Sequence, residues 1–341
     1  MARLLVALTA HGFGHLGQSA PILNSLRGVE LILATTLPQA VLERHLTVPF
    51  TRIERALDVG VRNQDALTVD RPGTRRAYQE FHARYPSDLD EETAWLRSCA
   101  PDAVLANVPY RVAEAAARLG IPCLAMCSLN WGDIVAGCLG EVACLPAIRR
   151  AYASVTEFWQ PIPSMPMESL PRRRELGLVA RRGMRRSLGL SGKLVLVSLG
   201  GLPLPRPSGW PDLPGVTWLV PEGWLPGHPR AVAVESLPVP FIDLVASADL
   251  LITKPGYGSF AEAASHGLPV LSLRRRDWPE EACLWEFMQR RGGLRELGRE
   301  AFLGGDFGAL VEELLEEPRP EPIEPEGVAQ AVERLGAYLE G

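Results

Sequence analysis

Lysine is almost absent from this 341-residue chain, whose basic residues are nearly all arginine. Lys193 and Lys254 are the only two lysines, and the formal net charge is −5. A chain with this balance creates no overall positive field that would attract nucleic acid or an acidic membrane surface. The sequence therefore predicts no nucleic-acid partner, and the position of each lysine becomes informative.

Long apolar runs and paired cysteine motifs are also missing. No stretch is apolar enough over its length to span a bilayer, and the opening MARLLVALTA predicts a strand rather than an export signal. The six cysteines show no C-x-x-C spacing and mostly sit in apolar surroundings. We therefore expect reduced, buried thiols in a cytoplasmic protein without a membrane span. Nothing in the sequence indicates an oligomeric state.

What the chain does have is two similar halves in which short apolar runs alternate with helical patterns. This alternation predicts parallel sheets with helices on both faces, and 341 residues suggest two such domains. A proline-rich stretch without periodicity, Gln160–Pro171, is the best candidate for a linker. We predict domains at 1–165 and 172–325, followed by a final amphipathic helix within 326–341.

The first half carries a glycine-rich turn directly after its first predicted strand. Gly12, Gly14 and Gly17 match the dinucleotide pattern G-x-G-x-x-G. That pattern also requires an acidic residue at the end of the second strand, where this chain has Ala34-Thr35-Thr36. A nicotinamide enzyme therefore stays only a minor alternative. The histidines at 11 and 15 instead suggest a working side chain in the turn.

The second half has a matching strand, turn and helix. The turn reads Lys254-Pro255-Gly256-Tyr257-Gly258-Ser259 and opens an alanine-rich helix. A helix N-terminus after a glycine turn can hold a phosphate, because unpaired backbone N–H groups point at the anion. Glu262 lies about one helical turn further on, where a carboxylate can accept hydrogen bonds from ribose hydroxyls. The alternative is a structural turn with a capping Ser259 and a solvated Glu262.

Polar residues follow several of the predicted strands in the first half. His11 and His15 follow the first strand, Asn107 ends another, and Asn130 and Asp133 follow the next. Ligands bind at the carboxyl ends of strands in such sheets. We therefore expect these side chains to converge along one edge.

Together these features resemble the GT-B fold of nucleotide-sugar glycosyltransferases, in which two Rossmann-like domains face each other across a cleft. The sequence is most similar to the glycosyltransferase-like N-terminal region of plant L-arabinokinases and its stand-alone bacterial relatives. The matching stretches are HGFGH (11–15), DALTVD (65–70), ETAWL (92–96), PSGW (207–210), GYGSFAEA (256–263) and RRDWPEE (275–281). No glycine/serine-rich ATP loop of the kinase type is present, so the resemblance implies no sugar-kinase activity.

The resemblance implies roles for individual residues. In the acceptor-side first domain, His15 would be the general base, with His11 as a second candidate. Some relatives orient this base with an Asp where this chain has Asn107, and Asp133 is the alternative candidate for that task. The donor would be bound mainly by the second domain, with the glycine turn of the first domain close to it. The residues implied are Gly12, Gly14, Gly200, Gly201, Lys254, Gly256, Tyr257, Gly258, Ser259, Glu262, Asp277, Glu280 and Glu281.

The function implied is transfer of a hexosyl or related sugar from a nucleotide-diphospho-sugar, most often UDP-linked in this fold, to an unknown acceptor. Lys254 would stabilise the leaving diphosphate, which favours an inverting reaction without a metal, and no D-x-D motif supports a bound Mg²⁺ at the site. No cofactor is expected besides the donor substrate. Two alternatives remain: a nucleotide-sugar epimerase or hydrolase, and a non-catalytic sugar-nucleotide-binding protein.

Overall fold

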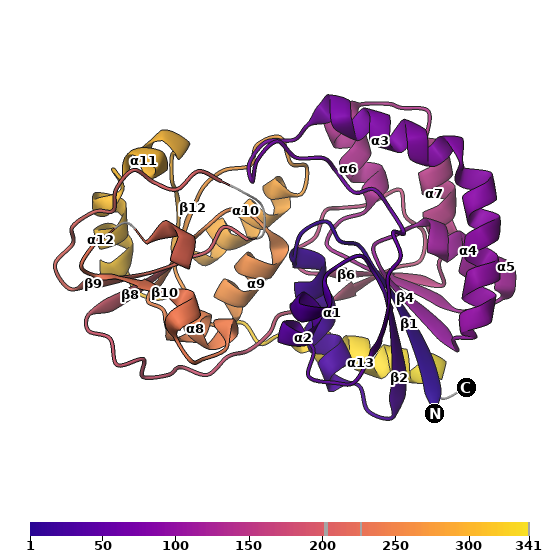
Figure 1. Ribbon diagram of the computed structural model, residues 1–341, viewed down its shortest axis with the longest axis horizontal. Coiled ribbons are helices and arrows are strands. Elements are labelled where there is room, and N and C mark those ends of the chain that lie inside the picture. The colour runs from indigo at the N-terminus through magenta and orange to yellow at the C-terminus, as the bar shows by residue number, and fades with distance from the viewer. Residues whose placement is uncertain (201–203, 226, 340–341) are drawn as a thin grey trace.

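Two α/β domains lie side by side in this computed structural model, which describes residues 1–200, 204–225 and 227–339 (Figure 1). Each domain is built on one all-parallel sheet, of seven strands in the first and six in the second. The prediction of two doubly wound domains is therefore confirmed.

The first sheet has the strand order β3-β2-β1-β4-β5-β6-β7. Its direction of growth reverses at β1, which pairs with both β2 and β4. The carboxyl ends of β1 and β4 therefore lie next to each other at a switch point, where such sheets bind ligands. The strands are β1 (Ala2–Leu8), β2 (Val29–Ala34), β3 (Thr51–Ile53), β4 (Ala103–Asn107), β5 (Cys123–Met126), β6 (Glu157–Pro161) and β7 (Arg173–Leu176).

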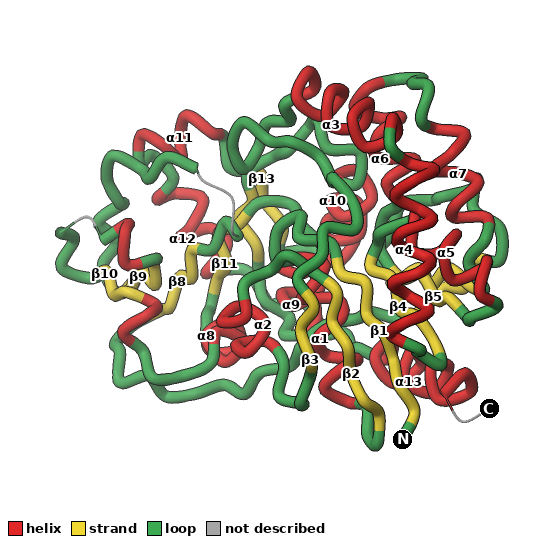
Figure 2. Tube along the Cα trace, turned by 45° about the vertical axis from the view of Figure 1, so that its right-hand side comes forward, coloured by secondary structure: helices red, strands yellow, loops and turns green. Residues whose placement is uncertain are grey.

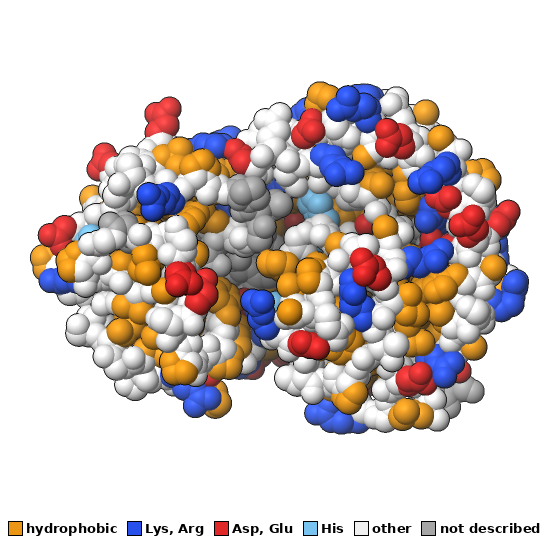
Figure 3. Space-filling model, viewed as in Figure 1, with side chains coloured by type: hydrophobic (Ala, Val, Ile, Leu, Met, Phe, Trp, Pro, Cys, Tyr) orange, Lys and Arg blue, Asp and Glu red, His pale blue; other side chains and the backbone are white. Residues whose placement is uncertain are grey.

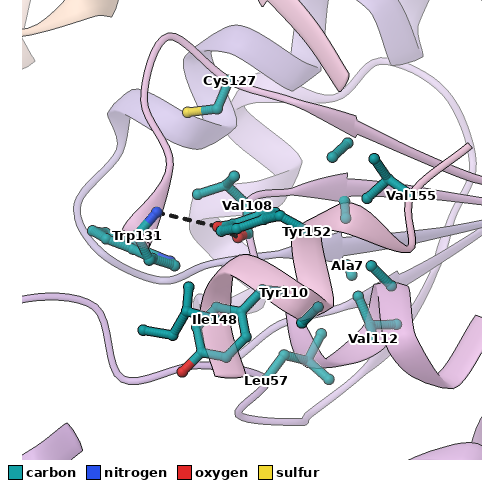
Figure 4. Close-up of a cluster of buried hydrophobic side chains, with 14 of the residues drawn as sticks. Ala7, Leu57, Val108, Tyr110, Val112, Cys127, Trp131, Ile148, Tyr152 and Val155 are labelled. Atoms are coloured by element: carbon teal, nitrogen blue, oxygen red, sulfur yellow. Dashed lines mark hydrogen bonds between the residues drawn. The ribbon is translucent and has the colours of Figure 1, made fainter. Parts of the chain in front are cut away.

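Helices cover both faces of this sheet, which explains why its central strands β1, β4 and β5 are apolar almost throughout. Leu4 and Val6 of β1 pack into one core, while Leu5 and Ala7 pack into the other. Figure 4 shows part of the second of these cores, with Trp131 beside Tyr152. The helices of this domain are α1 (Gly14–Ser25), α2 (Gln39–His45), α3 (Arg71–Ala83), α4 (Tyr85–Cys99), α5 (Arg111–Leu119), α6 (Trp131–Leu139) and α7 (Leu145–Ala153).

The second sheet has the order β10-β9-β8-β11-β12-β13, with the reversal at β8. β11 lies next to β8 and leads into the predicted phosphate turn. The strands are β8 (Lys193–Val197), β9 (Val216–Val220), β10 (Ala231–Ala233), β11 (Leu250–Thr253), β12 (Val270–Ser272) and β13 (Leu294–Glu296). The helices are α8 (Phe241–Ser247), α9 (Tyr257–Ser265), α10 (Glu281–Arg291), α11 (Arg299–Gly304) and α12 (Gly308–Glu316), with short 3-10 turns at Glu222–Trp224 and Val234–Ser236.

The first domain extends further along the chain than the predicted boundary at 165 and 172. β7 pairs with β6, so the proline-rich stretch is a connection inside the first domain. β7 is only four residues long and mostly exposed, with the sequence RREL, so it lacks the apolar run that marks the other strands.

The chain crosses between the domains twice, and the two crossings touch. α13 (Glu326–Leu339) returns to the first domain and lies against α1 and β7. In Figure 1 it is the yellow helix beneath the first domain. The Gly327 N–H donates to the Leu178 carbonyl over 3.0 Å. A Cβ on Gly327 would lie 2.1 Å from the Gly177 carbonyl oxygen, so only glycine allows this approach.

Tyr257 reinforces this crossing from the second domain. Its hydroxyl donates to the Ile162 carbonyl over 3.0 Å and accepts from the Val179 N–H over 3.0 Å. The side chain is 4% exposed. The start of α9 is therefore tied to both chain segments that flank the first crossing.

None of the helices in the described part of the chain combines the length and the apolar character needed to cross a membrane.

Candidate active site

The two glycine turns meet at the boundary between the domains. α1 begins at Gly14 and α9 begins at Tyr257, and these helices contact each other. A Cβ on Gly258 would lie 4.0 Å from the Gly14 Cα. Figure 2 shows α1 and α9 next to each other, and Figure 3 shows histidine atoms inside the hollow between the two lobes. The site is therefore built from both turns and the groups around them.

His15 lies in the first turn of α1 and is 6% exposed. Its Nδ1 lies 2.9 Å from Asn107 Oδ1. The Asn107 amide nitrogen faces the His15 carbonyl at 3.2 Å, and a carbonyl can only accept, so the amide oxygen must be the atom that faces the imidazole. His15 therefore carries its proton on Nδ1 and keeps a lone pair on Nε2.

Asn107 is itself held in place at the end of β4. Its amide nitrogen also approaches Gln18 Oε1 at 3.2 Å and Ser19 Oγ at 3.0 Å, and the residue is fully buried. An asparagine here orients the imidazole without adding a charge. Burial lowers the pKa of His15 to about 4, and the hydrogen bond that its Nδ1–H donates to Asn107 Oδ1 opposes this only in part. His15 is thus a neutral base at physiological pH, not a group that titrates near neutrality.

His11 occupies a different environment from His15. Its Nε2 donates to the Val61 carbonyl over 2.9 Å, and its ring stacks on Trp278 of the second domain at 5.6 Å between centroids. Gly60 packs against the ring, because a Cβ there would lie 2.9 Å from His11 Cδ2. Burial, reinforced by the charges of His15 and Arg275, lowers the pKa of His11 to about 3. His11 is therefore a neutral imidazole held between Val61 of the first domain and Trp278 of the second.

The structure does not bring Asp133 into hydrogen-bond contact with either histidine. Its carboxylate accepts from the Asn130 amide over 2.8 Å, and its N–H donates back to Asn130 over 2.9 Å. Asp133 thus completes the N-terminal cap of α6.

A different carboxylate, Asp58, lies among the aromatic groups beside His11. It accepts from Thr9 Oγ1 and from Trp131 Nε1, each over 2.8 Å. Burial raises the pKa of Asp58 to about 6. Asp58 belongs to an irregular segment after β3, and no motif in the sequence marks it.

In the second domain, the turn from Lys254 to Ser259 joins β11 to α9. Gly256 is the N-cap of α9, and no side chain caps the helix, so its first N–H groups are available to a ligand. The buried Tyr257 side chain is directed to the crossing described above, so of this residue only the backbone can face a ligand. Ser259 is half-buried.

Lys254 makes no side-chain hydrogen bond to the described residues. Burial, together with the charge of Arg275, lowers the pKa of Lys254 to about 8, and Glu280 acts in the opposite direction. A Cβ on Gly200 would lie 4.0 Å from Lys254 Cε, so the turn after β8 is next to this lysine. Gly201 lies outside the described residues. Lys254 is therefore a cation in an electropositive, partly desolvated position.

Glu262 has a protein partner. Its carboxylate pairs with Arg181 Nε over 2.6 Å, and the side chain of Glu262 is 7% exposed. A ribose could bind there only by displacing or sharing this arginine.

The three acidic residues after β12 have different hydrogen-bond partners. Glu281 accepts from Arg274 Nε over 2.6 Å and from the Arg275 N–H over 2.8 Å. Glu280 is buried, which raises its pKa, and accepts from Ser128 of the first domain over 2.5 Å and from Trp278 over 3.0 Å. Asp277 accepts the Val69 N–H over 2.7 Å with one oxygen only.

Two buried polar atoms next to this loop have no partner. Asp277 Oδ1 and Arg275 Nε make no hydrogen bond within the described part of the chain. The opposite charges of the two side chains interact. Because buried polar atoms are nearly always hydrogen-bonded in proteins, an unpaired acceptor and an unpaired donor in one loop mark a place where hydrogen-bond partners are missing.

A continuous hydrogen-bonded chain joins the two halves of the site. Asn107 donates to Gln18, Gln18 donates to Ser128 over 2.7 Å, and Ser128 donates to Glu280. Gln18 and Ser128 are 2% and 0% exposed. The residue that orients His15 is therefore linked through buried groups to the loop of the second domain.

Comparisons with known proteins agree with this architecture. No family model matches the chain. L-arabinokinase of Arabidopsis thaliana is 28% identical over an alignment of 325 residues, and the match covers 87% of this chain and 30% of that protein. The chain thus spans about a third of the curated relative it matches.

Among solved structures, the calicheamicin glycosyltransferase CalG4 superimposes with a TM-score of 0.67 at 16% identity, covering 99% of this chain and 98% of that one. The glycosyltransferase of kitacinnamycin gives 0.67 at 16% identity, covering 99% of each chain. VinC, solved with dTDP, gives 0.59 at 17% identity, covering 99% of this chain and 96% of that one. The chain has the GT-B fold of glycosyltransferases and resembles the part of plant L-arabinokinase that it matches.

Proposed function

We propose that this chain is a glycosyltransferase that moves a hexosyl or related sugar from a nucleotide-diphospho-sugar, UDP-linked as the first expectation, to an acceptor hydroxyl. One observation carries the proposal. A neutral imidazole with a fixed Nδ1 proton and a lone pair on Nε2 lies where the first glycine turn meets an uncapped helix N-terminus and a lysine. A proton acceptor and an anion site on opposite sides of one boundary are what a displacement at a sugar carbon requires.

In the proposed reaction, the acceptor oxygen forms a bond to the anomeric carbon and gives its proton to His15 Nε2. The bond between that carbon and the diphosphate oxygen breaks, and its electron pair leaves with the nucleoside diphosphate. This single displacement inverts the anomeric centre. Lys254 and the N–H groups of α9 stabilise the charge on the leaving group, so the step needs no metal.

The remaining predicted residues would bind the donor substrate. The turn from Gly256 to Ser259 would hold the diphosphate, with Gly12, Gly14 and the Gly200 turn allowing close approach. Asp277 would bind a donor-sugar hydroxyl, which would give Asp277 Oδ1 and Arg275 Nε the partners they lack. Glu280 and Glu281 would shape the sugar pocket, and Glu262 would bind the ribose once Arg181 moves aside.

A thermal-shift screen against UDP, GDP, dTDP, NAD, NADP and several sugar nucleotides tests the proposal. A ligand present at about a hundred times its dissociation constant adds roughly 2.7 kcal/mol of stability. Stabilisation by one nucleoside diphosphate and its sugars is the expected result. Stabilisation by nicotinamide cofactors alone would contradict it, and donor turnover that never needs an acceptor would identify a hydrolase or epimerase instead.

A further inference from the structure

A cavity of about 400 Å³ opens in the first domain at the carboxyl end of β1. It lies between the end of that strand and the irregular segment after β3, and His11 forms part of its wall. Asp58, Thr9 and Thr36 supply polar atoms, while Leu57, Val59 and Val61 supply apolar surface. The volume is near the lower end of the range for small-molecule sites.

Asp58 is the acidic group in this wall. Thr9 and Trp131 each donate one hydrogen bond, one to each carboxylate oxygen. A carboxylate has about four acceptor positions, so about two remain for a ligand. The described residues place no lysine or arginine in hydrogen-bond contact with Asp58, and Arg111 acts on it only at longer range.

The cavity wall also contains Arg55 and Arg62, but neither forms a hydrogen bond with the Asp58 carboxylate. The Arg55 guanidinium stacks on Trp95 at 4.5 Å, and Trp95 is not part of the wall. Arg62 is exposed, so it belongs to the rim. Thr36 is exposed as well, so the inner polar surface is a carboxylate with spare acceptor positions and the Thr9 hydroxyl that bonds to it.

We infer that this cavity binds the acceptor of the proposed reaction, and that the acceptor is a small, uncharged, polyhydroxylated molecule held by hydrogen bonds from its hydroxyls to Asp58. The inference rests on the proposed function. Hydroxyl donors to an ionised carboxylate form charge-assisted hydrogen bonds, which are stronger than neutral ones. An anion would be repelled by Asp58 and a cation by Arg55 and Arg62 of the same wall, and the apolar wall suits the C–H face of a sugar ring.

Saturation-transfer NMR on the whole protein tests this with D-glucose, D-galactose, myo-inositol and glycerol as neutral probes, and glucose 6-phosphate and glucosamine as charged ones. Asp58→Asn keeps the side-chain size but removes the charge. Glu54→Gln is the matched control, because Glu54 is an exposed carboxylate four residues away that pairs with Arg52. Thermal melting of each variant verifies that it is folded.

At least one neutral probe should bind wild type and Glu54→Gln alike, with affinity falling about 10- to 100-fold in Asp58→Asn, as expected when a hydrogen bond to a charged group is weakened. Equal binding to Asp58→Asn, no neutral probe bound by wild type, or tighter binding of either charged sugar would overturn the inference. UDP binding and hydrolysis of UDP-sugars, measured on the same samples, report on the proposed function separately.

Discussion

Both glycine turns connect a strand to a helix, but the polar groups of the first have hydrogen-bond partners in the protein, whereas several of the second have none within the part of the chain that the structure describes. In the first domain, Asn107 holds the imidazole of His15 and is itself held by Gln18 and Ser19. In the second domain, Lys254 has no hydrogen-bond partner among the described residues, and α9 has no side-chain cap. In the first turn the groups around the neutral base His15 are fully hydrogen-bonded, whereas in the second turn donors remain without a partner among the described residues.

This difference indicates what each turn does. Donors without protein partners beside a half-buried cation remain available to an anion. A fully satisfied network costs nothing further to keep one imidazole in one tautomer. The first turn is therefore suited to chemistry and the second to binding, and variants of each should separate turnover from affinity.

His15→Ala should give the largest effect. Loss of a general base lowers kcat by about 10²- to 10⁴-fold, whereas UDP affinity should change little because the nucleotide contacts lie in the second domain. Steady-state kinetics and calorimetry with UDP measure the two quantities. His45→Ala in α2 serves as the control. A comparable loss of UDP affinity in His15→Ala would remove the distinction between the turns.

Lys254→Met should weaken UDP binding about 10- to 100-fold, because a charge-assisted contact to the diphosphate is lost. Lys193→Met is the matched control, since Lys193 is exposed at the start of β8 and is the chain's other lysine. If both variants bind UDP as wild type does, the second turn is not the diphosphate site.

The pH dependence of UDP binding should report the same lysine. With its pKa lowered to about 8 by burial, Lys254 is charged below that pH and loses its charge above it. UDP affinity should therefore fall as the pH rises through about 8, by up to the factor that Lys254→Met costs. Lys254→Arg should have no such decline between pH 7 and 9, because arginine stays protonated. A decline shared by Lys254→Arg would assign the titration to another group.

Ser128→Ala tests the connection between the two regions and should have the smallest effect. Gln18 Nε2 and Glu280 Oε1 would lose their partner in a buried position. The free energy of unfolding should fall by about 1–3 kcal/mol, measured by denaturant titration. Ser98→Ala, at an exposed serine of α4, is the reference. Equal stability of the two variants would mean that the hydrogen-bonded chain does not hold the domains together.

The parts of this molecule that follow from local sequence were predictable. Each glycine turn stands between an apolar strand and a helix, so its position could be predicted, as could the parallel sheets. The neighbourhood of His15 and Asn107 follows because β1 and β4 pair at the switch point. α1 begins at Gly14, so the helix extends into the glycine turn itself.

Contacts between segments far apart in sequence were not predictable. Ser128 and Glu280 are 152 residues apart, and Arg181 and Glu262 are 81 apart. Neither pair belongs to a motif that specifies a partner. Asp58 lies in a segment without periodicity, and its hydrogen bonds with Thr9 and Trp131 hold it near His11. The side chains that complete the site are therefore the ones that sequence patterns describe least.

The two chain segments that connect the domains contact each other at Gly177 and Gly327, so a rotation of one domain relative to the other would have its hinge there. A rotation about this point moves nearby atoms little and distant ones much. Tyr257, bonded to both flanking segments, stays near the axis, whereas the Arg299–Asp65 ion pair joins α11 to the segment before α3. A small rotation of the second domain would break the Arg299–Asp65 ion pair and open the site to a large ligand, while the start of α9 would hardly move.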